Sequence, residues 1–564
     1  MVSRLARLGR RILASQSIGG LLVGMIFVAL SLTPSLLPRD FIVQGILSGC
    51  VFAAGYGIGV FAEWLWRYLE LDFPNPKLAR GVRLFALVGC TILVVVALWL
   101  STGWQNATRL LMGIAPVETQ QPVWVAAIAV IPALLLIGIG TLIVHGVRLV
   151  ARWLGRIIPR RVALILGMVI VGVVTTVFVN GVVVRWVLYT ADRFYANLDA
   201  LAGQYADEPT VPEHSGSAQS LVDWDTIGQD ARVYVQSGPT ADEIANITGK
   251  PAETPLRTYV GLRSAETAEA RAELALAEML RIGAFDRSVL VLIMPVGTGW
   301  IDPAAIDTLE FLHGGDVASV AVQYSYLTSW LSLLAEPEVG TETAQVLFST
   351  IYDHWTKLPR ETRPKLYLHG LSLGAYASQA SASIYNILAD PYQGALWVGP
   401  PFASTIWRGA TADRQPGSPA WLPRFENGSI IRFSNQNGDL ADAPAPWGPL
   451  RVVYLQYPSD PIVFFEPAML YRRPAWLEGP RAPDVSPQLN WYPVVTFLQL
   501  ALDMALSQTS PIGFGHVYAP QDYLDGWVAV TDAPGWTSDE LAELRRKVSR
   551  SGDISGILGG WFRR

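Results

Sequence analysis

Long apolar runs occupy the first third of the chain, and shorter runs separated by polar segments occupy the rest. A membrane-crossing helix needs about 20 mostly apolar residues. Five runs of that length are nearly free of charge and predict five transmembrane helices, at 18–37, 42–65, 83–101, 123–146 and 162–185. The first run follows a basic segment, as in a signal peptide, but it lacks a small-residue cleavage site. We therefore expect a membrane helix there.

After residue 256 the pattern changes to buried strands that alternate with helices. The run Ser288–Met294 is apolar throughout, as in a strand covered on both faces of a parallel sheet. Further strands are predicted at 317–323, directly before Ser372, at 395–398 and at 452–456, with helices near 302–313, 341–355, 375–388 and 494–507. This alternation predicts a doubly wound, mostly parallel sheet with helices on both faces.

The two patterns divide the chain into three parts. We predict a transmembrane helical module over 1–189, a connector over 190–255 and a catalytic domain over 256–564. The connector is rich in Pro, Gly, Ser and Asp, which favours loops, and contains one short predicted strand at 232–235.

Composition and charge agree with this division. The chain is 51% hydrophobic and only 16% charged, whereas a soluble globular protein is about 25% charged. Residues 1–189 carry 16 Lys and Arg against 5 Asp and Glu, and the remainder carries 26 against 42. Because phosphate binding needs a basic face, the acidic remainder argues against nucleic acid as a partner.

Basic residues are also shared unequally between the predicted loops. Thirteen lie before the first run, between the second and third, and between the fourth and fifth, whereas the opposite loops hold only Arg39 and Arg109. Cytoplasmic loops of membrane proteins carry the excess of Lys and Arg. We therefore expect a multi-pass protein of the cell membrane with a cytoplasmic N-terminus and, after five spans, an extracytoplasmic catalytic domain.

A G-x-S-x-G turn at Gly370–Gly374 is the main chemical signal. It follows an apolar strand and precedes a helix of small residues, which is the pattern of a nucleophile elbow. Such a turn holds its serine in a strained backbone at the top of a sheet, and glycine on either side allows the strand and helix to approach closely. This predicts Ser372 as a nucleophile.

A serine nucleophile needs a base and an orienting acid, in the chain order Ser, Asp/Glu, His for this architecture. His516 is the only histidine after Ser372 and lies in a glycine-flanked loop. Asp460 directly follows the predicted strand 452–456 and is the first choice for the acid. Asp439 and Asp442 remain alternatives, although the preceding Asn-Gly pair is typical of an ordinary turn.

The reaction also needs donors for an oxyanion and a pocket for the substrate. We expect the donors to be the Leu373 amide and amides of the loop Val296, Gly297 and Thr298, although that loop could be a plain tight turn. Tyr324, Tyr326 and Trp330 could line an acyl pocket or cap the core. Only Cys50 and Cys90 are present, both in apolar runs, and we expect no metal or cofactor.

Taken together, these segments resemble a family of membrane-anchored α/β-hydrolases from actinobacteria, with a multi-span N-terminal module and an "α/β-hydrolase-9"-type catalytic domain. The resemblance rests on Ser237–Ile244, Arg257–Arg263, Pro295–Asp302, Gln323–Leu327, the elbow, Ser459–Pro461 and Gly515–His516. Leu371 departs from the pattern, because such elbows often carry Glu there. The resemblance implies an α/β-hydrolase fold and hydrolase chemistry, but not a substrate.

Three functions fit these residues. The first is an extracytoplasmic serine esterase or lipase that acts on acyl esters of membrane or cell-envelope lipids. The second is an acyltransferase that uses the same triad to transfer an acyl group to a sugar or lipid hydroxyl. The third is a non-catalytic membrane scaffold that keeps the hydrolase fold. The sequence indicates neither the acyl-chain length nor the oligomeric state.

Overall fold

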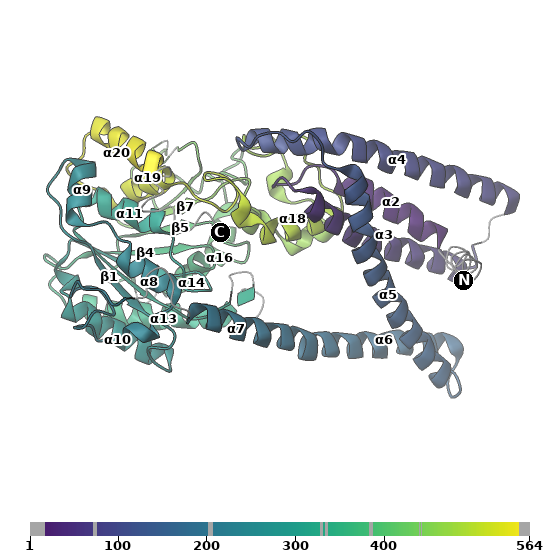
Figure 1. Ribbon diagram of the computed structural model, residues 1–564, viewed down its shortest axis with the longest axis horizontal. Helices are drawn as coiled ribbons and strands as arrows, with labels where there is room; N and C mark the ends of the chain where they lie inside the picture. The colour runs from purple at the N-terminus through teal and green to yellow at the C-terminus, as the bar shows by residue number, and fades with distance from the viewer. Residues whose placement is uncertain are drawn as a thin grey trace. The chain divides into compact units, whose positions relative to one another are not determined.

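The fold was obtained as a computed structural model (Figure 1). Contacts within the chain group it into a helical unit, Met1–Arg185 with Phe465–Ser507, and a sheet-containing unit, Trp186–Phe464 with Gln508–Arg564. The structure describes residues 17–71, 76–200, 207–327, 331–332, 337–382, 387–438, 440–441 and 443–551.

The helical unit begins with a short helix followed by long ones. Among the described residues, four helices are long and apolar enough to cross a membrane. They are α3 (Phe41–Tyr68), α4 (Pro76–Leu111), α5 (Pro122–Leu154) and α6 (Arg160–Phe178), which continues through η1 (Val179–Val184) into α7 (Arg185–Asp199).

The prediction of five spans is therefore inexact. The run predicted at 18–37 forms only the 14-residue helix α2 (Ile18–Ser31). Pro34 lacks a backbone N–H and disfavours helical backbone at Thr33, so the helix ends before the apolar run does.

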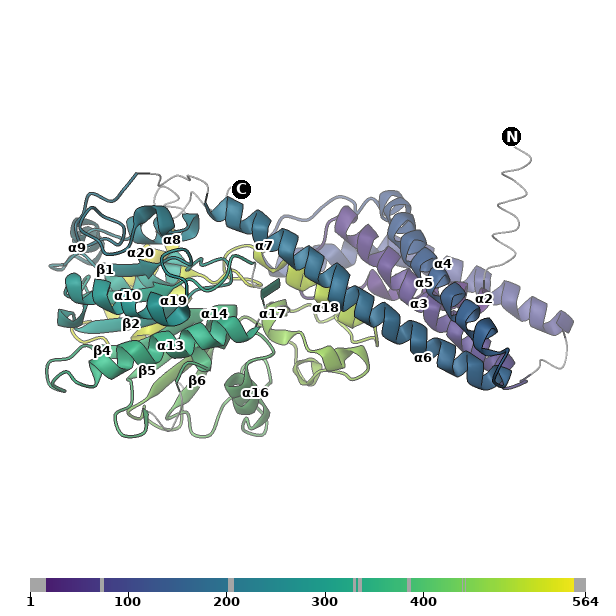
Figure 2. The same ribbon diagram turned by 90° about the horizontal axis from the view of Figure 1, so that it is seen from below.

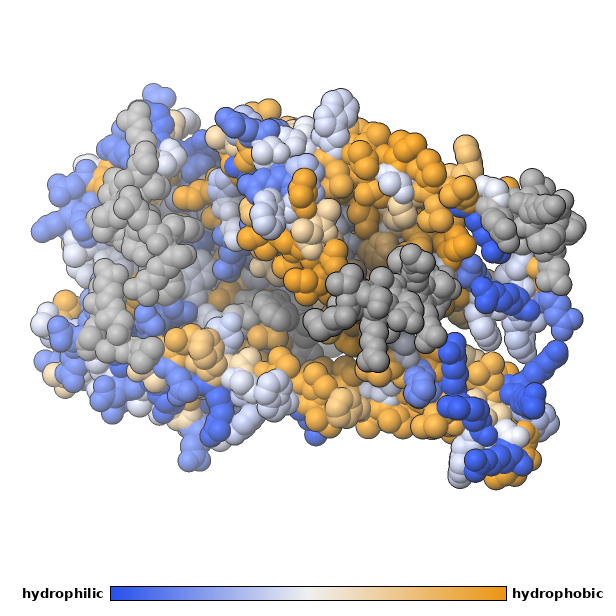
Figure 3. Space-filling view, turned by 45° about the vertical axis from the view of Figure 1, so that its right-hand side comes forward, coloured by the Kyte–Doolittle hydropathy of each residue, from blue (hydrophilic) through white to orange (hydrophobic). Residues whose placement is uncertain are grey.

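The long helices present apolar side chains on their outer surface. Phe85 and Trp99 of α4 are 82% and 78% exposed, and Ile131 of α5 is 73% exposed. Figure 3 shows hydrophobic residues gathered over these helices, whereas hydrophilic residues dominate the sheet-containing unit. Exposed apolar surface of this extent is expected where lipid replaces water, so the helical unit associates with a membrane.

A segment from late in the chain belongs to the helical unit. It contains η4 (Pro467–Leu470), η5 (Ala475–Leu477) and α18 (Val495–Ala505), the helix predicted near 494–507. Asp503 Oδ2 accepts a hydrogen bond from the Leu36 amide at 3.1 Å. The Gln499 side chain donates to the Ser31 and Thr33 carbonyls at 3.2 and 3.1 Å. These bonds satisfy the Ser31 and Thr33 carbonyls where α2 ends and the Leu36 amide beyond it.

The described residues of the sheet-containing unit form a seven-stranded sheet, all paired in parallel, in the order β1-β3-β2-β4-β5-β7-β6. The strands are β1 (Leu256–Val260), β2 (Val289–Met294), β3 (Val317–Val322), β4 (Lys365–Leu371), β5 (Gly394–Val398), β6 (Ile431–Ser434) and β7 (Arg451–Leu455). β2 and β3 are buried along their whole length, as the uninterrupted apolar sequence of β2 predicts for that strand.

Helices cover both faces of this sheet (Figures 1 and 2). One layer contains α10 (Ala268–Arg281), α13 (Pro337–Trp355) and α14 (Leu373–Gln379). The other contains α9 (Ala241–Thr248), α11 (Pro303–Leu312), α19 (Pro520–Thr531) and α20 (Ser538–Ser551). The remaining helices α16 (Thr405–Ala412) and α17 (Pro461–Phe464) follow β5 and β7.

The strand predicted at 232–235 is wrong, because these residues lie in helix α8 (Gln229–Gln236). The four-residue run Arg232–Val235 is buried, so its apolar pattern cannot separate a strand from a helix. Helical hydrogen bonds form there instead, because the Arg232 and Ser237 amides donate to the carbonyls four residues before them, Gly228 and Val233, at 3.0 and 2.8 Å.

Candidate catalytic site

Ser372 stands in a sharp turn between β4 and α14. Its backbone has φ 56° and ψ −122°, a strained conformation for a residue other than glycine. A Cβ at Gly370 would overlap the backbone of Gly374, so glycine is required where the strand and helix approach. The structure thus forms the strand–turn–helix that the G-x-S-x-G pattern predicts, with the serine 5% exposed.

Asp460 and His516 form a buried hydrogen-bonded pair. His516 Nδ1 lies 2.6 Å from Asp460 Oδ2, and the Tyr518 hydroxyl donates to the same oxygen at 2.7 Å. The other carboxylate oxygen accepts the Ile462 amide at 2.8 Å, at the start of α17. Burial, with the Asp460 carboxylate beside it, raises the pKa of Tyr518 well above its ordinary value, so its hydroxyl stays protonated and donates.

The loop after β5 brings this pair to the elbow. The Ser372 amide donates to the Val398 carbonyl at 2.8 Å. The next residue, Gly399, has φ 51°, and a Cβ there would lie 2.7 Å from His516 Cε1. His516 therefore lies against the backbone of Gly399, the neighbour of Val398, whose carbonyl accepts the Ser372 amide.

The serine and the histidine are close in the fold but are not bonded to each other. His516 Nε2 is buried and has no hydrogen-bond partner among the described residues. It is the nitrogen left over when Nδ1 contacts Asp460, and it is therefore the nitrogen available to a nucleophile. Catalytic hydrogen bonds are often long before substrate binds and tighten afterwards.

The loop after β2 lies against the elbow. A Cβ at Gly374 would overlap the Met294 carbonyl oxygen, so this glycine lets the loop approach the start of α14. Leu373 is the first residue of α14, where backbone amides have no partner within a helix. The start of the loop, at Met294 and Pro295, thus lies against Gly374, the residue after Leu373.

The three predicted loop donors differ in their hydrogen bonds. The Val296 amide donates to the Trp300 carbonyl at 3.0 Å, so it is already used within the turn. The amides of Gly297 and Thr298 donate to no residue that the structure describes. Of the predicted loop residues, these two are the better placed to supply the second donor.

Buried polar side chains that the sequence analysis did not identify hold this loop. The Thr298 hydroxyl donates to Asp230 of α8 at 3.0 Å, and the Gln323 side chain donates to the Thr298 carbonyl at 3.1 Å. The Tyr259 hydroxyl donates to the Gly299 carbonyl at 2.7 Å. Burial raises the pKa of Asp230 to about 7, and the nearby Asp199 carboxylate adds to this effect.

The predicted substrate-binding residues have different surroundings. Tyr324 is 3% exposed, its ring packs beside Gly340 of α13, and burial raises its pKa. Tyr326 is half-buried. Trp330 and the alternative acids Asp439 and Asp442 lie outside the described residues.

Other features of the described residues suggest no further catalytic group. His369 is buried in β4, its Nδ1 lies 2.8 Å from the Leu396 carbonyl oxygen, and burial lowers its pKa to about 4. No group of three or more His, Cys, Asp or Glu side chains in the described part of the chain could hold a metal ion.

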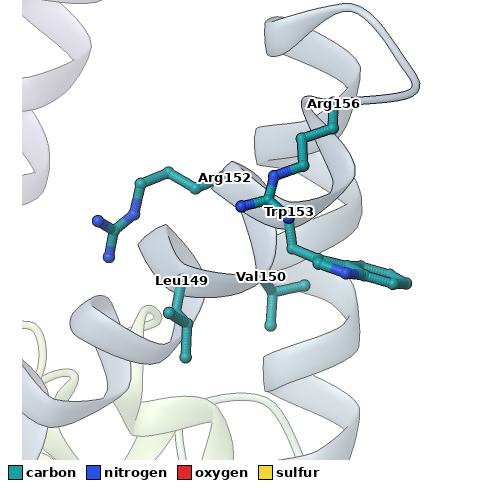
Figure 4. Close-up of a pocket in the computed structure, with 5 residues that line it drawn as sticks. All are labelled: Leu149, Val150, Arg152, Trp153 and Arg156. Atoms are coloured by element: carbon teal, nitrogen blue, oxygen red, sulfur yellow. The ribbon is translucent and has the colours of Figure 1, made fainter.

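Two cavities lie away from the predicted triad. One of about 440 Å³ is lined by residues near the end of α5, namely Leu149, Val150, Arg152, Trp153 and Arg156 (Figure 4). Another of about 730 Å³ lies between α13 and the residues after α14 and includes Gln345, Tyr352 and Ser381. Neither is lined by Ser372 or His516.

Comparison with known proteins matches most of the chain to one family. A sequence model described as "Alpha/beta-hydrolase family" matches residues 256–544, and one described as "Alpha/beta-hydrolase family N-terminus" matches residues 32–239. No curated protein and no solved structure matches the chain.

Proposed function

Because the chain belongs to the alpha/beta-hydrolase family, we propose that it is a serine hydrolase that cleaves acyl esters with Ser372, His516 and Asp460. The observation that carries this proposal is the 2.6 Å contact between His516 Nδ1 and Asp460, close to a serine in a strained elbow. A histidine that only supports the fold would not need a buried carboxylate at one ring nitrogen. It would also not need a second ring nitrogen without a hydrogen bond close to a strained serine.

The proposed reaction follows from these positions. His516 Nε2 takes the Ser372 proton as Oγ attacks the acyl carbonyl, and Asp460 stabilises the resulting imidazolium. The amides of Leu373 and of Gly297 or Thr298 stabilise the oxyanion. The imidazolium then protonates the leaving alcohol, and an acyl-serine remains. Water, deprotonated by His516, attacks this ester and releases the carboxylic acid, which restores Ser372.

Full-length protein in lipid nanodiscs provides the test, with p-nitrophenyl acyl esters of increasing chain length as substrates. Ser372→Ala should abolish hydrolysis and labelling by a fluorophosphonate. Ser349→Ala is the matched control, because this serine is exposed on α13. Equal turnover by Ser372→Ala and the wild type would refute the proposed nucleophile.

We also propose that the catalytic unit lies outside the cytoplasmic membrane. Nine of the thirteen basic residues lie between the end of α3 and the first turns of α4, or between the last turns of α5 and the start of α6, whereas the opposite side holds Arg39 before α3 and Arg109 near the end of α4. Positive loops stay in the cytoplasm, so the segment after α6 and α7 lies on the opposite side. The side of the membrane proposed for this segment is the same whether or not the short α2 crosses. The cytoplasmic location of the N-terminus does depend on whether α2 crosses. It stays a prediction from Arg4, Arg7, Arg10 and Arg11.

A reporter fusion tests this orientation. Alkaline phosphatase joined after residue 190 should be active, because the enzyme folds only outside the cytoplasm, and a fluorescent-protein fusion after residue 71 should fluoresce. An inactive phosphatase fusion would contradict the proposed location. An external site beside the bilayer favours esters of membrane or envelope lipids as substrates, which the chain-length series addresses.

A further inference from the structure

The loop proposed to bind the oxyanion is held by a residue from outside the predicted catalytic domain. Asp230 belongs to α8, which lies between the last apolar helix and the first strand. Its carboxylate accepts the Thr298 hydroxyl at 3.0 Å. Thr298 thus contributes both this hydroxyl and a backbone amide that is one of the proposed oxyanion donors. Fixing the side chain of Thr298 therefore restricts the direction in which its amide points.

The same network continues to the end of the last apolar helix. Asp199, the last residue of α7, lies beside the Gln229 amide and the Gln323 side chain, both of which lower its pKa against the rise that burial causes. Gln323 in turn donates to the Thr298 carbonyl. Arg263 lies 3.5 Å from Asp199 and neutralises part of its charge. The Asp230 carboxylate and the Gln323 amide thus hold Thr298 from two sides, through its hydroxyl and its carbonyl.

We infer that Asp230 is a positioning residue for the oxyanion hole, acting through Thr298, with Gln323 holding the Thr298 carbonyl from the other side. The inference rests on the proposed function, because it assigns a purpose to the network only if the loop binds an oxyanion. It implies that the segment joining the membrane helices to the sheet is part of the catalytic apparatus and does more than connect the two.

A double-mutant cycle in the full-length protein tests this role, with p-nitrophenyl butyrate as the probe. Asp230→Ala should lower kcat about 10- to 100-fold, because donors misplaced by about 1 Å lose much of their effect on the transition state. KM should change little, since the loop stabilises charge that develops during the reaction. Thr298→Val should have a similar effect, and the double variant should lose no more than either single variant.

Two further variants separate positioning from folding. Thr298→Ser keeps the hydroxyl and should retain near wild-type kcat. Asp225→Asn removes an exposed carboxylate from the same connecting segment, whose side chain is 94% exposed, and should leave kcat unchanged. Thermal unfolding is measured for each variant. If Asp230→Ala unfolds, the comparison of Thr298→Val with Thr298→Ser still reports on the same hydrogen bond.

The outcomes distinguish this inference from the proposed function. If a folded Asp230→Ala or Thr298→Val variant keeps wild-type kcat, the positioning role is refuted. Loss of activity in Ser372→Ala would still support the proposed nucleophile in that case. Additive losses in the double variant would also refute it, because the two side chains would then act separately. A wild-type protein that neither hydrolyses the probe nor reacts with a fluorophosphonate would refute both proposals.

Discussion

Replacing Asp460 with asparagine is the most direct test of the proposed acid–base pair. Asp460 is fully buried, and one of its oxygens accepts from both His516 and the Tyr518 hydroxyl. Asparagine has nearly the same size but presents an amide donor where one oxygen stood. An amide nitrogen facing His516 Nδ1 favours the tautomer with its proton on Nε2, and this tautomer cannot accept the Ser372 proton.

The size of the effect follows from which contacts remain. Loss of tautomer control in a serine–histidine–aspartate triad lowers kcat about 10⁴-fold, or about 5.4 kcal/mol of transition-state stabilisation. The remaining side-chain oxygen can still accept the Ile462 amide, so the start of α17 should persist. We therefore expect a large fall in kcat and a small change in the temperature of unfolding.

The assay measures kcat and KM for p-nitrophenyl butyrate with full-length protein in nanodiscs, beside thermal unfolding. Asp532→Asn is the matched control, because its side chain is 74% exposed and its backbone is left-handed (φ 51°), which asparagine tolerates. If folded Asp460→Asn keeps kcat within about threefold of the wild type, Asp460 does not orient the base, and the reasoning from this hydrogen bond fails.

Three further predictions concern the fold around the site. Gly374→Ala should prevent fluorophosphonate labelling and lower the unfolding temperature, because its Cβ would overlap a carbonyl oxygen, whereas Gly409→Ala in the open middle of α16 should be neutral or stabilising. Arg257→Met should destabilise the fold by about 3–5 kcal/mol in denaturant titrations, since it leaves two buried carboxylates without their cation. Burial raises the pKa of Asp302 to about 6 from 3.8, so the folded state binds this proton more tightly than the unfolded state. Stability should therefore fall by up to about 3 kcal/mol as pH rises from about 4 to 6, and Asp302→Asn should flatten that slope in denaturant titrations at several pH values.

Much of the sheet could be predicted because its strands are buried on both faces. β2 has an uninterrupted apolar sequence, so its identity does not depend on periodicity. β4 contains Lys365 and His369, and its place directly before the G-x-S-x-G turn identified it. The edge strand β6 was not predicted, because its four residues, Ile431–Ser434, include an arginine and are only partly buried. Residues 232–235 show the converse error, in which a buried apolar run of a helix has the composition of a strand.

The candidate site was predictable where chain order restricts the choice. His516 is the only histidine after Ser372, and Asp460 follows a predicted strand. The side chains that support these residues were not predictable in this way. Asp230 bonds Thr298 across 68 positions of the chain, and no local pattern near Asp230 indicates that partner. Tyr518 lies two residues after His516, but only the fold shows that both donate to one oxygen.

The most consequential feature that the sequence does not indicate is where the chain runs between the acid and the base. It leaves the sheet-containing unit after Phe464, four residues beyond Asp460, and returns at Gln508 before His516. The intervening segment is held in the helical unit by buried bonds from Asp503 and Gln499 to backbone groups near the end of α2. A fragment cut before residue 190 would leave these polar side chains and the apolar face of α18 without their partners. Unsatisfied buried groups and exposed apolar surface both disfavour folding. The proposed triad is therefore best studied in the full chain, because the segment that joins Asp460 to His516 packs as part of the membrane-associated unit.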